Sequence, residues 1–70
     1  MNTNELKAAM KRNEDTQEKL AEALGLQTSG VNERVNGHIE FRRSEINAIR
    51  KRYNLSDADT IRIFFDENVS

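Results

Sequence analysis

Side chains capable of catalysis or metal binding are scarce in this chain. Its 70 residues include one histidine and no cysteine. His38 has no second ligand, nucleophile or orienting carboxylate at a recognisable spacing, so the sequence predicts neither a metal site nor a catalytic site. We therefore expect a protein that is not an enzyme, needs no cofactor and acts on no small-molecule substrate.

Basic side chains are concentrated in one part of the chain. The net charge is -1, which by itself argues mildly against a nucleic-acid partner. Between residues 36 and 53, however, basic residues outnumber acidic ones, and after residue 54 the balance is reversed. The basic residues of the first stretch are Arg42, Arg43, Arg50, Lys51 and Arg52. Segregation of this kind can give an acidic protein a basic face, and DNA would meet that face. The last three fall late in a predicted helix, where cations suit the helix dipole, and this favours a structural role for them.

The elements that must position these residues are predicted to be helices. There is no proline, and Glu, Lys, Arg, Ala and Leu are common, which is helix-forming composition. Apolar spacing and capping residues predict an all-α fold of five short helices in a single domain, residues 1–70. The first helix follows Asn2 and stops at Asn13, and the second lies between Thr16 and Gly25. The third begins at Gln27 or Thr28 and ends at Asn36-Gly37. The fourth carries Ile46, Ile49 and Tyr53, and the fifth follows Ser56.

Five of these helix ends have specific local signals. Asn2, Thr16 and Ser56 are good N-caps, and Gly25 can supply the left-handed turn that ends the second helix. Asn13 is expected to take a left-handed conformation at the end of the first. With neither disulfides nor an apolar run long enough for a signal or a membrane helix, we expect a cytoplasmic protein with no membrane partner.

Residues 16–26, together with Val31 and Asn36-Gly37, form a familiar pattern. The stretch reads Thr16-Gln17, then Leu20-Ala21, then Leu24-Gly25-Leu26. It resembles the helix-turn-helix of the phage repressor and Cro family, and Glu40-Phe41, Ser44-Glu45-Ile46 and Ile63-Phe64-Phe65 resemble small phage regulators of this type. The resemblance implies a lambda-repressor-like fold with the helix-turn-helix in helices 2 and 3. It also implies that double-stranded operator DNA is the partner, bound through the major groove.

The resemblance assigns roles to individual positions. The base contacts it implies are Thr28, Ser29, Asn32 and Glu33, whose side chains can bond to base edges. The phosphate contacts it implies are Gln17, Arg34, Asn36, His38, Arg42 and Arg43. The expected function is that of a Cro-like repressor in the genetic switch of a temperate phage or prophage.

Two residues of the predicted recognition helix depart from this scheme. Glu33 brings a negative charge towards the phosphates. Gly30 costs about 1 kcal/mol relative to alanine within a helix. Either the missing side chain of Gly30 permits close approach of the helix to DNA, or Gly30 is an ordinary helical position with no role in binding.

The C-terminal segment carries Ile61, Ile63, Phe64 and Phe65 within five positions. One helix face can bury Ile61 with Phe64 or Phe65, so Ile63 is expected to stay outside. Ile63, Phe64 and Phe65 are therefore the predicted protein interface, for a weak homodimer or a heteromer with another phage repressor. Two alternatives to the repressor remain open: an antirepressor that binds another regulator, and the antitoxin of a toxin–antitoxin pair.

Overall fold

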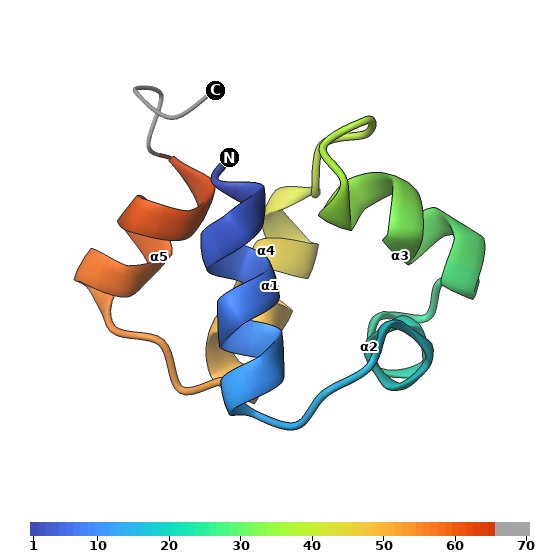
Figure 1. Cartoon of the computed structure of the whole chain (residues 1–70), viewed down its shortest axis with the longest axis horizontal. Coiled ribbons are helices and arrows are strands. Elements are labelled where there is room, and N and C mark those ends of the chain that lie inside the picture. Colours follow the sequence, from blue (N-terminus) through green and yellow to red (C-terminus); the bar gives the residue numbers. More distant parts are fainter. Residues whose placement is uncertain (66–70) are drawn as a thin grey trace.

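The fold consists of five α-helices and no strand within residues 1–65, the part of the chain that this computed structural model describes (Figure 1). The helices are α1 (Thr3–Arg12), α2 (Gln17–Leu24), α3 (Thr28–Val35), α4 (Arg43–Arg52) and α5 (Asp57–Phe64). The all-α class predicted from the sequence is confirmed. None of these helices combines the length and apolar character needed to cross a membrane.

The predicted N-caps are present at three helices. The side-chain oxygens of Asn2, Thr16 and Ser56 each accept a hydrogen bond from the backbone N–H three residues later, at 3.0–3.1 Å. Each cap satisfies a donor that the first helical turn leaves without a partner. Gly25 ends α2 with a φ of 69°, as its position predicts.

The end of α1 differs from the prediction. Asn13 keeps a negative φ of -94°, and Glu14 takes the left-handed conformation instead, with a φ of 51°. The Asn13 side chain donates a hydrogen bond to the carbonyl of Ala9 at 2.7 Å, and its backbone N–H reaches the same oxygen. Asn13 thus satisfies the end of the helix from an ordinary backbone conformation, and the chain reverses one residue later.

A single hydrophobic core joins all five helices. It is built around six fully buried aliphatic side chains together with alanine, methionine and aromatic residues. Its members are Leu6, Ala9, Met10, Leu20, Ala21, Val31, Val35, Phe41, Ile49, Tyr53, Ile63 and Phe64. Phe41, in the loop before α4, packs edge-to-face on Phe64 with ring centroids 5.8 Å apart.

The placement of Ile63 on the outside is wrong. Ile63 is fully buried and Phe64 is 7% exposed, whereas Ile61 and Phe65 are each 58% exposed. The buried stripe of α5 is Thr60, Ile63 and Phe64, at positions i, i+3 and i+4. Thr60 can be buried because its hydroxyl donates to the carbonyl of Ser56 at 2.8 Å. A stripe that begins on a threonine is not visible in a pattern built from apolar residues alone.

Candidate nucleic-acid interface

Helices α2 and α3 make the largest helix–helix contact of the fold. In Figure 1 α2 is seen end-on while α3 runs across the view, so the two cross steeply. Leu20 and Ala21 of α2 are buried with Val31 and Val35 of α3. The connection, residues 25–27, is closed by a hydrogen bond of 2.9 Å from the N–H of Leu26 to the carbonyl of Ala21. With its apolar side packed in this way, α3 presents its polar side to solvent.

The four predicted base contacts share that solvent-facing side of α3. Thr28, Ser29, Asn32 and Glu33 are all exposed. The structure also joins two predicted contacts of different kinds: the Nδ2 of Asn32 donates to the Oε1 of Gln17 at 3.0 Å. Gln17 is the first residue of α2, so this bond links the start of α2 to the middle of α3. Their roles towards DNA remain predictions.

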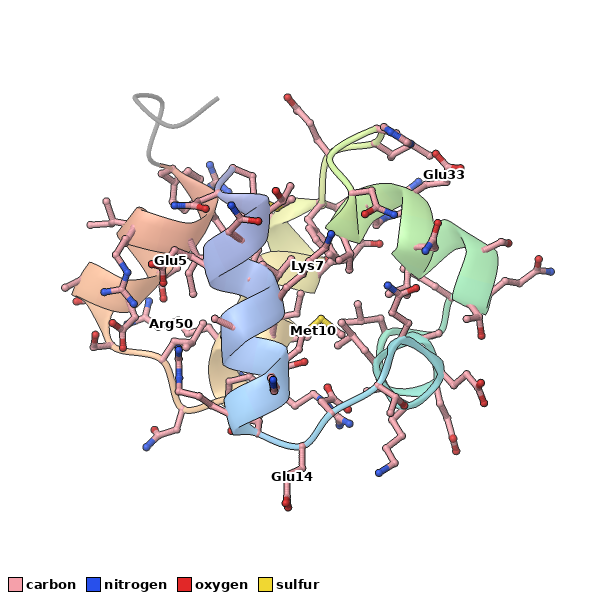
Figure 2. The ribbon with its side chains drawn as sticks, in the orientation of Figure 1. Glu5, Lys7, Met10, Glu14, Glu33 and Arg50 are labelled. Atoms are coloured by element: carbon pink, nitrogen blue, oxygen red, sulfur yellow. The ribbon has the colours of Figure 1, made fainter. Side chains whose placement is uncertain are left out.

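Glu33 is paired with His38. Its Oε2 lies 3.0 Å from the Nδ1 of His38, and both side chains are largely exposed. The backbone N–H of His38 also bonds to the carbonyl of Glu33 at 2.9 Å, so the loop after α3 folds back on the end of the helix. Figure 2 shows Glu33 at this loop side of α3, far from α1. The Glu33 carboxylate is therefore held against His38 at the C-terminal end of α3.

Arg34 is not placed to reach a phosphate. Its side chain is only 12% exposed, and its Nε donates to the Oε1 of Glu45 at 3.1 Å. Its Nη1 donates to the carbonyl of Gly30 at 3.0 Å. The sequence could not place Arg34 correctly, because its partner lies on another helix.

Glu45 is the residue of this region that the sequence analysis missed. It is buried in the first turn of α4, where its Oε1 also accepts the backbone N–H of Arg42 at 2.8 Å. That bond is one half of a capping box. Arg42 is not one of the usual capping residues, so the capping role of Glu45 was not predictable from the local sequence.

Arg42 and Arg43 are the basic residues left at the edge of this surface. Both are exposed, as are Asn36 and His38 in the same loop, and neither arginine forms an ion pair within residues 1–65. Figure 2 also shows Lys7 of α1 extending towards α3, a cation that the sequence analysis passed over.

Two of the three cations late in α4, Arg50 and Arg52, form ion pairs away from α3. Arg50 pairs with Asp57. Arg52 donates two hydrogen bonds to Asp15, at 2.8 and 2.9 Å, and the hydroxyl of Tyr53 donates to the same carboxylate. The Arg52 hydrogen bond is the main reason that the pKa of Asp15 falls to about 2, and burial with the bond to Asp15 raises the pKa of Tyr53. Arg50 and Arg52 therefore act as structural residues.

An apolar hollow lies beside the predicted nucleic-acid interface. It has a volume of about 450 Å³ and is lined by the loop before α4, by α4 itself and by the end of α5. Two exposed apolar side chains border it, Ile39 and Phe65, with the half-buried Ile46 and Met1 further in. Of the three residues of the predicted protein interface, Phe65 is the one that remains accessible, because Ile63 and Phe64 belong to the core.

Comparison with known proteins returned no match: no family model fits the chain, and no curated protein or solved structure shows significant similarity to it. Within residues 1–65, no three histidine, cysteine, aspartate or glutamate side chains are grouped to hold a metal ion.

Proposed function

We propose that the protein is a sequence-specific DNA-binding regulator of transcription, a Cro-like repressor in the switch of a temperate phage or prophage. The observation that carries the proposal is the exposed polar face of α3, which the packing of α2 holds away from the core. In a helix-turn-helix this face enters the major groove, and the first residues of the helix reach base edges.

The surroundings of α3 supply phosphate-binding groups on both sides. Gln17 stands at the N-terminus of α2, where free backbone N–H groups attract an anion. Arg42 and Arg43 lie beyond the other end of α3, exposed and without an acidic partner within residues 1–65. Phosphate contacts on either side of a reading helix fix its register on the duplex.

The proposal is tested by a gel shift with the DNA that flanks the protein's own gene. We expect binding to a specific site, with log K falling by about 0.9 per phosphate contact against log salt. Lack of binding to this DNA at low salt would contradict the proposal.

A second candidate is an antirepressor that binds another regulator. Ile39 and Phe65 favour it, because exposed apolar side chains beside a hollow are typical of a protein interface. Adding the products of neighbouring genes to the same gel shift separates the two functions. An antirepressor releases DNA from another protein and binds none itself.

A further inference from the structure

A chain of polar contacts connects α3 to the beginning of α4. The Oε1 of Glu45 accepts the backbone N–H of Arg42 at 2.8 Å and the Nε of Arg34 at 3.1 Å. Arg34 in turn donates to the carbonyl of Gly30 at 3.0 Å. The contacts run from the middle of α3, across the loop of residues 36–42, to the first turn of α4.

This ion pair is largely withdrawn from water. The Arg34 and Glu45 side chains are 12% and 9% exposed. A buried pair adds little net stability, because removing two charges from water offsets their attraction. Its attested benefit is orientation, since few arrangements satisfy both groups at once. Arginine suits this task because its planar guanidinium donates in fixed directions.

Gly30 makes room for the arrangement. A Cβ at this position would lie 3.3 Å from the Nη1 of Arg34, which is closer than ordinary van der Waals contact. The guanidinium therefore lies close to the helix backbone at the one residue of α3 without a side chain. This gives the glycine of α3 a role within the protein itself.

We propose that Glu45 is a positioning residue which, through Arg34, sets the orientation of α3 relative to the start of α4. The inference rests on the proposed DNA-binding function. The base-reading residues lie on α3, whereas Arg42 and Arg43 lie at the start of α4. The ion pair between Arg34 and Glu45 fixes the distance between the residues that read bases and the arginines that bind phosphates. Glu45 therefore determines sequence specificity without touching DNA.

The decisive variant is Glu45→Gln, because the amide oxygen can still cap Arg42 while the charge that holds Arg34 is lost. Its matched control is Glu40→Gln, which removes the same charge from an exposed side chain in the same region, without an ion pair to break. Both variants bring one fewer negative charge to the DNA, so any difference in DNA binding between them reports on the position of α3. Arg34→Met removes the other partner at similar length.

We expect Glu45→Gln to bind the best site at least about tenfold more weakly than Glu40→Gln, with a broader preferred sequence. The salt slope should stay that of the wild type in Glu45→Gln and in Arg34→Met, because no phosphate contact is lost. Arg34→Met combined with Glu45→Gln should cost no more affinity than either alone, since the two changes break one interaction. If Glu45→Gln does not fold, Arg34→Lys replaces it with the same expected loss, because a lysine cannot donate in two fixed directions.

Two results of the binding measurements would overturn the positioning role. One is equal affinity of Glu45→Gln and Glu40→Gln for the best site. The other is a salt slope lowered by about 0.9 in Arg34→Met, which would make Arg34 a phosphate contact. Amide hydrogen exchange separates this failure from that of the proposed function. If the wild type binds no DNA, faster exchange in Glu45→Gln confined to α3 and residues 36–42 still supports the positioning role, and unchanged exchange there rejects it.

Discussion

At the scale of single residues, Asp15 is a carboxylate whose side chain is largely withdrawn from water. Only 3% of its side chain is exposed, and it accepts hydrogen bonds from Arg52 and from Tyr53. These contacts join the turn after α1 to the end of α4, which are distant in the sequence. Loss of these contacts should therefore lower the free energy of unfolding of the whole domain.

The lowered pKa of Asp15 predicts how this stability depends on pH. The pKa falls from 3.8 to about 2 on folding, so the folded state binds fewer protons than the unfolded state between these values. The contribution, about 2 kcal/mol, is complete above pH 4 and is lost as the pH falls through 2. Urea unfolding should show Asp15→Asn less stable than the wild type at pH 7, with the gap closing near pH 2. Asp57→Asn, at an exposed ion pair, is the control; a gap for Asp15→Asn that is constant with pH contradicts the prediction.

Gln17 and Asn32 should act on DNA as one unit. Asn32→Ala is expected to relax base preference at one or two positions, at a cost of about 1–3 kcal/mol on the best site. Gln17→Ala should weaken all sequences and also loosen preference at the Asn32 position, because it frees that amide from its 3.0 Å bond. Arg43→Ala, the control, should weaken all sequences alike. Binding-site selection on the three variants checks this, and an unaltered motif for Asn32→Ala would remove it from the base-reading set.

At the scale of elements, the helices and their caps followed from local signals. Asn2, Thr16, Ser56 and Gly25 act within three or four residues of their own position, so a linear pattern is enough to recognise them. The exposed face of α3 was predictable for the same reason, since polar residues alternate with Val31 and Val35 at helical spacing.

Features that depend on a distant partner were not predictable in this way. Ile63 is buried because the N-terminus of α1 covers the end of α5, where the N–H of Asn2 donates to the carbonyl of Ile63 at 2.7 Å. Arg34 turns inward because Glu45 lies on the next helix. In both cases the local sequence does not show which distant residue packs against the side chain, so its burial could not be predicted.

Gly30→Ala tests the packing of α3 itself. Alanine should stabilise a helix by about 1 kcal/mol relative to glycine. Here the new Cβ would crowd the Arg34 guanidinium at 3.3 Å, so we expect a smaller gain. In an Arg34→Met background the full gain should return, because the crowded group is gone. Thermal melting of the four proteins measures the difference, and equal gains in both backgrounds would show that Arg34 does not restrict the site. Lower DNA affinity in both backgrounds would support close approach of this helix to DNA.

At the scale of the whole molecule, the net charge of -1 does not describe how charge is distributed over the surface. Arg50, Arg52 and Arg62 are paired with acidic side chains remote from α3, whereas Arg42 and Arg43 have no such partner within residues 1–65. The average charge therefore says little about the face that DNA would meet.

The apolar hollow beside α5 should serve association with a second protein, and Phe65 is the residue that tests it. Phe65 is 58% exposed and borders the hollow, so Phe65→Ser should leave folding nearly intact while weakening self-association, or capture of a second regulator. Ile61→Ser is a matched control, because Ile61 is also 58% exposed but does not line the hollow. Ile63→Asp is unsuitable, since a charge at a fully buried position would unfold the domain. Sedimentation and cooperativity of DNA binding should change for Phe65→Ser and not for Ile61→Ser. Equal behaviour of the two variants, both folded by thermal melting, would exclude the hollow as an interface.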